Sequence, residues 1–437
     1  MEPDKDSATL HDRHRAVMPT WLATYYDEPL ELVAGNGRHV TGGDGRTYLD
    51  FFGGLLATMI GHNIPEITEA LQRQAGKLLH SSTLYLIRSQ VELAEKIAAK
   101  APIDNPKVFF VNSGSEAVET AFLLTTTARR SNQVIALRGS YHGRSFGTVA
   151  ATGIRGWSAS SLSPLNVTYA HSGYKYRSPF SDLDDHAYIA ACKDELRTMI
   201  QTSTSGDIAC YIAEPIQGAG GFATPPDGFF LAMKEVLDEY DVPYVSDEVQ
   251  SAWGRTGRSY FGIEHYGVRP QAITFAKGLA NGISIGGVVA ESDLMDCLTA
   301  NSISTAGGNP IAMTAANAVL DYIESNDLQE NAHRVGQILF DGLTTLASNN
   351  PLIGEVRGSG LMLGVELVHP GTRTPATAET DIVLAECRAA GMLIGKGGLA
   401  GNVLRVTPPM TVTESEAHSA LGILEDVLAK VSATHSL

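Results

Sequence analysis

Ionisable side chains close three short apolar runs of the sequence. Glu214 ends "YIAE", Asp247 and Glu248 end "YVSDE", and Lys277 ends "AITFAK". A carboxylate or an amine is costly to bury unless a group of opposite charge or a hydrogen-bonding ligand meets it. A ligand shared by the acids is one explanation of this pattern, and a metal site or a solvated loop is the other. The local sequence leaves that choice open.

Lys277 has the most specific chemistry of these residues. In an apolar surrounding, desolvation lowers the pKa of a lysine and leaves a neutral amine that can bond a carbonyl carbon. Many lysines that precede a glycine are merely exposed at a turn, and Lys396 in "LIGKGG" has a similar setting. The local sequence favours Lys277 as the reactive amine and leaves Lys396 as its rival.

The stretch "VFFVNSGSEAVETA" (108–121) passes from an apolar run through small residues into a helical pattern. The first-turn amides of a helix that begins at Ser113–Ser115 would form a ready anion site, suited to a phosphate. Ser113 and Glu116 also have the spacing of a capping box, which would satisfy those amides internally. Both interpretations stay open at this point.

A regular alternation positions these groups from about residue 100 onward. Short apolar runs alternate with helical patterns, and the runs are "KVFFV", "QVIAL", "IACYIAE", "PYVSDE" and "AITFAK". Because they are apolar throughout rather than at every second residue, they predict a mostly parallel sheet with helices on both faces. Ligands of such a sheet bind beyond the carboxyl ends of its strands, where the ionisable residues lie.

The rest of the chain predicts a smaller C-terminal lobe. From about residue 313 the pattern indicates one long or two consecutive amphipathic helices, then strand-like "GSGLMLGVELV" and "NVLRVTPPM", and a final helix from about Glu414 to Val431. The stretch "GRHVTGGDGRTYLDFFGG" (37–54) predicts a hairpin or meander that packs on this lobe. We therefore expect an N-terminal segment over residues 1–60, a large domain over 61–315 and a small domain over 316–437.

Composition narrows the class of partner and the compartment. A formal net charge of -16 opposes binding to nucleic acid or to anionic lipid. No stretch approaches the roughly 20 apolar residues of a membrane span, and the polar start "MEPDKDSATLHDRHR" has no apolar leader. Four scattered cysteines without a C-x-x-C pair, Cys192, Cys210, Cys297 and Cys387, fit a reducing compartment and argue against a structural zinc site. We expect a cytoplasmic protein without a metal.

Taken together, the strand-end groups match the parts of pyridoxal 5'-phosphate. The turn at 113–115 suits the phosphate, Lys277 suits the aldehyde, and Asp247 suits a protonated pyridine nitrogen. An acid at that nitrogen keeps the ring charged, so the ring can accept electrons as a carbanion forms on a substrate. Glu248 is expected to point away, because neighbouring strand residues alternate.

Eight stretches resemble, in order and spacing, the class III aminotransferases, which are pyridoxal phosphate enzymes of fold type I. They are "NSGSEAVETA", "YHGRSFGT", "AEPIQG", "SDEVQSAWGRTG", "TFAKGLANG", "TAGGNP", "VRGSGLMLGVEL" and "LRVTPP". The resemblance spans nearly the whole chain and is nearest to the alanine:glyoxylate and 4-aminobutyrate branch. It implies an α/β fold, in which a large domain has a mostly parallel seven-stranded sheet flanked by helices and a smaller α+β domain is C-terminal.

The resemblance also implies the site residues. Lys277 would be catalytic, forming an internal aldimine and moving a proton, together with Asp247 at the ring nitrogen. The implied cofactor-binding set is Gly114, Ser115, Tyr141, His142, Glu214, Asp247, Val249, Gln250, Lys277 and Thr305. In this set Tyr141 stacks on the ring, Val249 packs under it, and Gln250 bonds the ring hydroxyl. Thr305 is similar to a threonine that reaches the phosphate of the neighbouring subunit, so the resemblance implies a homodimer, free or paired into a tetramer.

Two arginines are expected to bind the substrate. Arg405 matches the family residue that grips the α-carboxylate, and Arg144 matches one that some members use for a distal carboxylate. The sequence departs from the 4-aminobutyrate and ornithine enzymes at Ala219, where those enzymes have a glutamate that masks the α-carboxylate arginine. Ala306 stands where an aromatic residue is usual. The first departure favours donors and acceptors that both carry an α-carboxylate.

The predicted reaction is a ping-pong transfer of an amino group from an amino acid to a 2-oxo acid. Other members of the same family are an amino-acid racemase, an amino-group mutase and a decarboxylating transaminase, and these stay as alternatives. A non-catalytic nucleotide-binding protein is the alternative from a different class. Against it, "NSGSEA" lacks the lysine of a P-loop, and no G-x-G-x-x-G follows a first strand.

Overall fold

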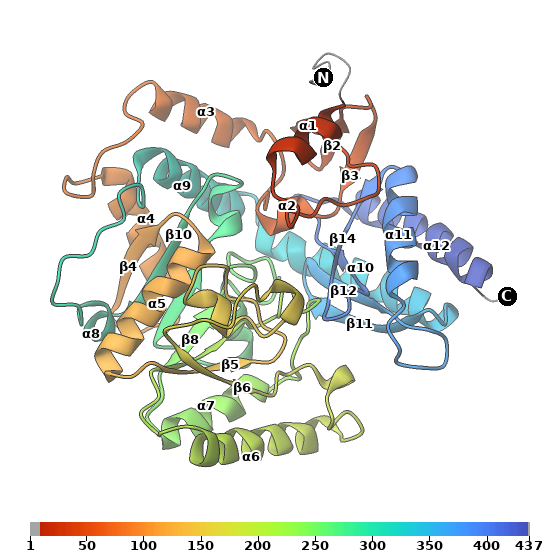
Figure 1. Ribbon diagram of the computed structural model, residues 1–437. Helices are drawn as coiled ribbons and strands as arrows, with labels where there is room; N and C mark the ends of the chain where they lie inside the picture. Colours follow the sequence, from red (N-terminus) through yellow and green to blue (C-terminus); the bar gives the residue numbers. More distant parts are fainter. Residues whose placement is uncertain (1–8, 436–437) are drawn as a thin grey trace, which may run out of the picture.

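The computed structural model describes residues 9–435 of the chain, so the acidic start at residues 1–8 and the last two residues lie outside it. Within the described residues, one seven-stranded sheet and two four-stranded sheets are present. The large sheet and its helices form one part of the molecule, and the C-terminal helices and a four-stranded sheet form a second part beside it (Figure 1).

The seven-stranded sheet confirms the predicted architecture. Its strands, in spatial order, are β4 (Pro106–Val111), β10 (Gly286–Glu291), β9 (Ala272–Phe275), β8 (Tyr244–Asp247), β7 (Cys210–Ala213), β5 (Gln133–Leu137) and β6 (Asn166–Ala170). The pairs from β9 to β6 are parallel, while β10 runs antiparallel to both of its neighbours. The carboxyl ends of β4, β9, β8, β7 and β5 therefore meet at one edge, where sheets of this kind bind ligands.

Burial on both faces explains why the strand sequences are apolar throughout. In β5, Val134 and Ala136 pack in the core beneath α5 (Gly114–Arg129). The alternate residues Ile135 and Leu137 pack in the opposite core, which α6, α7 and α9 help to form. These three helices are α6 (Asp185–Ser203), α7 (Phe229–Glu239) and α9 (Pro310–Ser325). Residues of a strand that is covered on both sides have no polar face, so their pattern cannot alternate.

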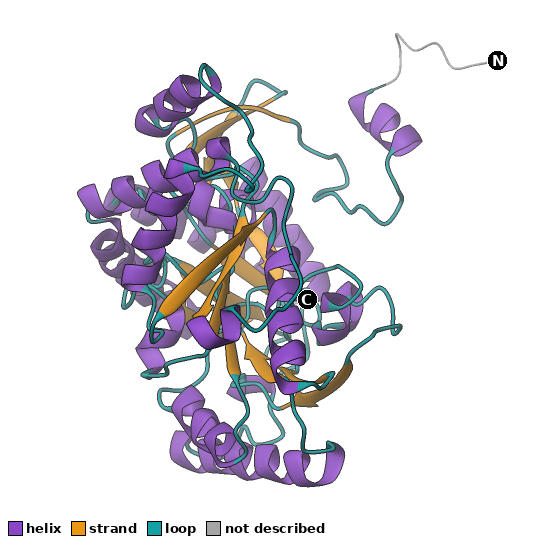
Figure 2. Cartoon of the chain, turned by 90° about the vertical axis from the view of Figure 1, so that its left-hand side faces the viewer, coloured by secondary structure: helices purple, strands orange, loops and turns teal. Residues whose placement is uncertain are grey.

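The N-terminal strands form a meander whose last strand pairs with a strand of the C-terminal part. The strands β1 (Leu32–Asn36), β2 (His39–Gly42) and β3 (Thr47–Asp50) pair antiparallel, and β3 then pairs parallel with β13 (Met392–Leu393). Before this meander, α1 (Leu10–Val17) has no buried residue and stands apart from the body of the molecule (Figure 2).

The C-terminal part differs in one detail from the sequence prediction. Its sheet has the order β11 (Ile353–Ser359), β12 (Met362–Leu367), β15 (Val403–Val406) and β14 (Gly395–Gly397). The stretch predicted as a single strand, "GSGLMLGVELV", is instead a hairpin, because Gly360 turns the chain with φ +55°. A side chain there would lie 2.5 Å from the Thr256 backbone, so only glycine fits.

The helical region after residue 310 consists of two helices, α9 and α10 (Leu328–Asn349). The break between them contains Asp327, whose φ of +49° is not helical. The predicted domain boundary after residue 315 falls inside α9 and stays a prediction. The remaining helices are α2 (Gly53–Leu56), α3 (Pro65–Ala75), α4 (Arg88–Lys100), α8 (Ser292–Met295), α11 (Thr377–Ala389) and α12 (Glu414–His435). Of the helices in residues 9–435, none combines the length and the apolar character that crossing a membrane requires.

Candidate active site

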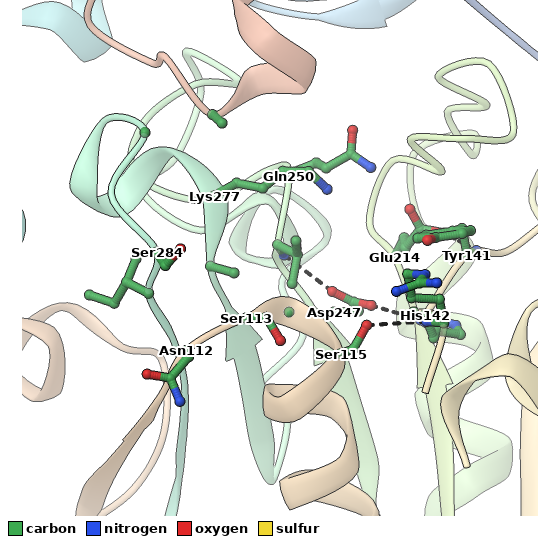
Figure 3. A pocket seen from close by; sticks show the side chains of 18 of the residues that line it. Asn112, Ser113, Ser115, Tyr141, His142, Glu214, Asp247, Gln250, Lys277 and Ser284 are labelled. Atoms are coloured by element: carbon green, nitrogen blue, oxygen red, sulfur yellow. Dashed lines mark hydrogen bonds and ion pairs between the residues drawn. The ribbon is translucent and has the colours of Figure 1, made fainter. Parts of the chain in front are cut away.

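A cavity of about 330 Å³ opens at the carboxyl edge of the seven-stranded sheet (Figure 3). This volume is in the range of small-molecule sites. Among the predicted residues, those that line it are Gly114, Ser115, Tyr141, His142, Arg144, Glu214, Asp247, Val249, Gln250 and Lys277. They come from strand ends far apart in the sequence, which the parallel topology brings together. The cavity therefore gathers almost all of the predicted site.

The turn before α5 leaves amides free at one end of the cavity. Ser113 caps the helix by accepting from Glu116 N at 3.2 Å, but the second half of a capping box is missing. The Glu116 carboxylate instead accepts from Asn112 N at 2.9 Å. Within the part of the chain that the structure describes, the Gly114 and Ser115 amides donate to no acceptor. This outcome favours the anion site over the internally satisfied cap.

Lys277 follows β9 in a strained turn, η5 (Lys277–Ala280), with φ +42°. A left-handed backbone is uncommon for a residue with a side chain and persists where the surroundings enforce it. The pKa of the Lys277 amine is lowered from 10.5 to about 8, first by burial and then by the nearby Arg405 charge, while Asp247 and Glu214 act in the opposite direction. The amine thus has the lowered basicity that bonding to a carbonyl requires.

The side chain of Asn281 ties this turn to a segment far away in the sequence. The sequence prediction missed this role. Asn281 Oδ1 accepts from Ile60 N at 3.0 Å, and its Nδ2 donates to Gly61 O at 2.8 Å. Met59, next in that segment, lies against Gly278, where a side chain would approach its sulfur to 2.7 Å. The segment 59–61 is therefore fixed over the lysine turn.

Arg255 links the same segment to the C-terminal part of the molecule. Its guanidinium is buried and donates to the carbonyls of Met59 at 3.3 Å, Leu361 at 3.1 Å and Pro408 at 2.9 Å. Burial lowers the pKa of Arg255 to about 9. Because Pro408 follows the strand that carries Arg405, these bonds tie that strand to the segment over the Lys277 turn.

Asp247 is buried at the centre of the site and pairs with His142. The distance from His142 Nδ1 to Asp247 Oδ2 is 2.7 Å, and Asp247 Oδ1 accepts from Val249 N at 3.2 Å. The other ring nitrogen, His142 Nε2, is buried and has no partner among the described residues. Figure 3 shows His142 on one side of Asp247 and Lys277 on the other. The carboxylate is thus oriented by the imidazole and faces the cavity.

Two further carboxylates near Asp247 have different surroundings. Glu214 accepts from Tyr141 N and from Gly218 N, both at 2.8 Å, and burial raises its pKa to about 7. Glu248 does not line the cavity, because it turns to the opposite side and accepts from Gly262 N at 2.9 Å and Ile263 N at 2.8 Å. Burial raises the pKa of Glu248 to about 7 as well. Alternation along the strand separates the two neighbouring acids as predicted.

Arg405, on β15, does not line the cavity itself but bonds Gln250, which does. Its Nη2 donates to Gln250 Oε1 at 2.9 Å, and the side chain is buried, which lowers its pKa to about 10. Arg144 lies at the cavity wall, with its guanidinium over the Trp21 ring at 5.7 Å from the ring centre. Of the two predicted substrate arginines, Arg144 lines the cavity, whereas Arg405 lies behind its wall and contacts it through Gln250.

Two predicted features lie elsewhere. Lys396 forms an ion pair with Asp381 and does not line the cavity, so this rival amine is outside the site. Thr305 is exposed on the surface and is likewise absent from the cavity wall of its own chain. The wall also includes the segment 282–285 and Ala57, which carry no chemical signal in the sequence.

The residues present fit pyridoxal 5'-phosphate. Free amides stand at one end of the cavity, a buried carboxylate at its centre and a buried amine of lowered pKa across from them. A side chain on Gly114 would press to 3.2 Å against both methyls of Val249, so the glycine keeps the space beside that valine open. In residues 9–435, no three His, Cys, Asp or Glu side chains gather as a metal would need. This donor set suits the cofactor rather than a cation.

The lowered pKa of Lys277 predicts how cofactor uptake depends on pH. Burial disfavours the charged amine, so at a pKa of about 8 the neutral form becomes dominant between pH 7 and pH 9. We expect covalent uptake of pyridoxal phosphate by the cofactor-free protein to rise about tenfold over this interval and then level off, against about a hundredfold for an amine of ordinary pKa. Stopped-flow absorbance measures the uptake, and pyridoxine 5'-phosphate, which lacks the aldehyde, is the control. A rate that still climbs steeply above pH 9 contradicts the lowered pKa.

Comparisons with known proteins agree with this geometry. The family model described as aminotransferase class-III matches residues 23–428. The chain is 38% identical over 409 residues to alanine–glyoxylate aminotransferase 2 homolog 2, mitochondrial, of Arabidopsis thaliana, covering 93% of this chain and 84% of that protein. It is 32% identical over 435 residues to an alanine/serine racemase of Pyrococcus horikoshii, covering 97% and 90%. The crystal structure of a thermostable omega transaminase 6-fold mutant from Pseudomonas jessenii superposes with a TM-score of 0.90 at 25% identity, covering 98% of this chain and 99% of that one.

Proposed function

The chain belongs to the class III aminotransferase family, and we propose that Lys277 and Asp247 carry the reaction of this pyridoxal phosphate-dependent enzyme. The enzyme moves an amino group from an amino donor to a 2-oxo acid. One observation carries the assignment of these two residues: a buried amine with a pKa of about 8 shares a cavity with a buried, histidine-paired carboxylate.

Each part of the site has a task in holding the cofactor. The Gly114 and Ser115 amides would bind the phosphate, and Tyr141 and Val249 would pack against the ring. When bound, pyridoxal phosphate acts as an electron sink for the bond broken at the substrate α-carbon. Asp247 would hold a proton on the ring nitrogen. His142 Nδ1 lies 2.7 Å from Asp247 Oδ2 and keeps the Asp247 carboxylate turned toward the cavity.

Lys277 performs both the anchoring and the proton transfer. Its amine would hold the cofactor, and once released from it the Nζ would take the proton from the substrate α-carbon. A pKa of about 8 suits this task, since the amine can exchange protons in either direction near neutral pH. Glu214 supports the site by fixing the backbone of Tyr141 and Gly218.

We infer that Arg405 binds the α-carboxylate of the substrates. It is buried, carries a charge and donates only to the neutral amide of Gln250 among the described residues, so its guanidinium remains available to a carboxylate. Ala219 lies beside this arginine, because Gly397 approaches both the Ala219 carbonyl and Arg405 Cδ. Without an acid at this position, donors and acceptors with an α-carboxylate are favoured over ω-amines. The similarity to a protein named alanine–glyoxylate aminotransferase supports this class.

Replacement of Arg405 by alanine tests this substrate class. The loss of a buried charge-assisted pair is expected to raise KM for L-alanine and pyruvate about a hundredfold, while the rate with 2-aminopropane, which has no carboxylate, stays within about threefold. Arg144→Ala is the matched variant. It should affect 2-oxoglutarate, which has a second carboxylate, and spare pyruvate. An unchanged donor profile in Arg405→Ala contradicts the assigned grip.

We propose that the enzyme is a homodimer. The segment 78–86 exposes apolar side chains, among them Leu86 at 98%, and Leu84 and Tyr85 are also exposed. Gln90 follows this segment in the chain and lies close to Gly308, in the loop after Thr305. A side chain on Gly308 would touch the Gln90 amide. A second copy covering this surface would bring Thr305 to the partner's phosphate. Sedimentation measures the assembly, including any pairing of dimers into tetramers, and a monomer at micromolar concentration would contradict the proposal.

We also propose a cytoplasmic location. The four cysteines, Cys192, Cys210, Cys297 and Cys387, are all unpaired, as in a reducing compartment. The relative from Arabidopsis thaliana is named as mitochondrial, so the location of a tagged chain decides between the two compartments.

The similarity to a racemase supports a second candidate function. A relative named as a racemase is 32% identical to this chain, and one fold can host more than one reaction, so the fold alone does not separate the two. Incubation with L-alanine and no oxo acid does separate them. A transaminase stops after forming one equivalent of pyruvate per site and loses its yellow colour, whereas a racemase stays yellow and forms D-alanine.

A further inference from the structure

Phe222 lies directly against Arg405, although its sequence context gives no hint of a role. The centre of its ring is 4.5 Å from Arg405 Cζ, and the side chain is fully buried. A guanidinium over the face of an aromatic ring is attracted by the negative charge of that face. Among residues 9–435, no carboxylate forms an ion pair with Arg405, and its Nε has no hydrogen-bond partner. The Phe222 ring and the Gln250 side-chain oxygen, which accepts from Arg405 Nη2 at 2.9 Å, therefore both contact this buried charge directly.

The backbone of Phe222 is strained in a way that presents the ring. Its φ is +54°, in the left-handed region that bulky residues avoid. The preceding Gly221, at φ +85°, leads the chain into this conformation. Outliers of this kind persist only when the surroundings enforce them, and they gather at functional sites.

The surroundings of Phe222 hold it from behind. Gly221 O accepts from Arg357 Nε at 2.9 Å, and Arg357 Nη1 pairs with the fully buried Glu366 at 2.7 Å. On its apolar side the ring packs in a small cluster with Leu56, Ile216 and Met362. The strand β11, which carries Arg357, thus fixes the turn that carries Phe222.

We propose that Phe222 is a positioning residue that replaces the counter-charge of Arg405 and keeps this arginine open to a carboxylate in both half-reactions. The proposal rests on the substrate class inferred for Arg405. A neighbouring carboxylate would have to be displaced by each incoming substrate, whereas an aromatic ring covers one face of the guanidinium and leaves its N–H edge free. The site therefore selects substrates with an α-carboxylate twice per cycle.

Phe222→Leu and Phe222→Met remove the ring while keeping an apolar side chain. Each is expected to raise KM for L-alanine and for pyruvate about tenfold, with kcat within about twofold and 2-aminopropane unaffected. The Kd of propanoate for the holoenzyme, measured by calorimetry, should rise by the same factor. Phe222→Tyr, which keeps the ring, should restore the wild-type values.

Met362→Leu is the matched control. Met362 packs in the same apolar cluster as Phe222 but has no aromatic ring to place against Arg405. This variant should lower the melting temperature as much as the Phe222 variants do and leave KM and the Kd of propanoate unchanged. If the Phe222 variants lose stability but keep the Kd of propanoate, the ring only fills the core and the proposal is overturned. A wild-type enzyme that uses 2-aminopropane as well as L-alanine overturns the assigned substrate class itself. A strong carboxylate preference that survives in Phe222→Leu overturns the role of Phe222 alone.

Discussion

Lys277→Ala is expected to lower turnover by about four orders of magnitude or more while the fold is retained. Lys277 is the one lysine on the cavity wall formed by the described residues, so no neighbouring amine can replace it. Its burial already costs free energy, as the lowered pKa shows, and removal of the amine relieves that cost. The melting temperature should therefore stay near the wild-type value. Steady-state kinetics with L-alanine and pyruvate, together with thermal unfolding, measure both expectations.

The second lysine that the sequence offered provides the control for this variant. Lys396 pairs with Asp381 outside the cavity, so Lys396→Ala should keep nearly full activity. Methylamine added to Lys277→Ala is expected to restore part of the rate, because a small amine can enter the vacated space and carry the proton. Near-normal turnover in Lys277→Ala, or a loss confined to Lys396→Ala, is incompatible with the assigned role.

Asp247→Asn is expected to lower kcat about a thousandfold. The amide has nearly the shape of the carboxylate and can still bond His142 Nδ1, but it carries no charge to hold a proton on the ring nitrogen. The loss should appear mainly in kcat rather than in KM, because the missing interaction matters most as negative charge develops on the substrate. Single-turnover absorbance of the cofactor measures the chemical step separately from binding.

Glu248→Gln separates this electrostatic effect from a general effect of removing a buried acid. Glu248 is adjacent in sequence and fully buried, but it faces the amides of Gly262 and Ile263 on the opposite side. Its replacement should lower the melting temperature and change kcat less than about threefold. Equal losses of kcat in the two variants would mean that the charge of Asp247 has no specific task.

The sequence predicted the part of the structure that follows from hydrophobic pattern and strand direction. The apolar runs that end at Glu214, Asp247 and Lys277 are strands, or lead directly out of strands, of one largely parallel sheet. Parallel strands end at the same edge, so the residues that follow them must meet there. This reasoning needs no contact between particular side chains, and for that reason it succeeds from sequence alone.

Contacts between distant segments could not be predicted in this way. The bridge from Asn281 to the segment 60–61, the ring of Phe222 under Arg405, and the bond from Arg405 to Gln250 join positions more than 150 residues apart. Asparagine and phenylalanine in such positions have no local signal, because their role depends on the close packing of separate elements. The positive φ of Lys277 likewise has no local signal in the sequence.

Two other features could not be recognised from the sequence of one chain. The stretch 358–368 reads as one apolar strand, and the turn within it depends on the close approach of Gly360 to the backbone of Thr256. Thr305 is exposed in its own chain, so its predicted contact with a phosphate requires a second copy. The first feature needs the tertiary structure to be recognised and the second needs the quaternary structure.

Reduction of the yellow holoenzyme with sodium borohydride, followed by mass mapping of its peptides, tests most directly whether Lys277 holds the cofactor. Borohydride fixes the cofactor on the amine to which it is bonded. We predict one label per chain, on the peptide that contains Lys277, and none on this peptide in Lys277→Ala. A label on Lys396 or on any other lysine, with the Lys277 peptide unmodified, would contradict the central role of this amine.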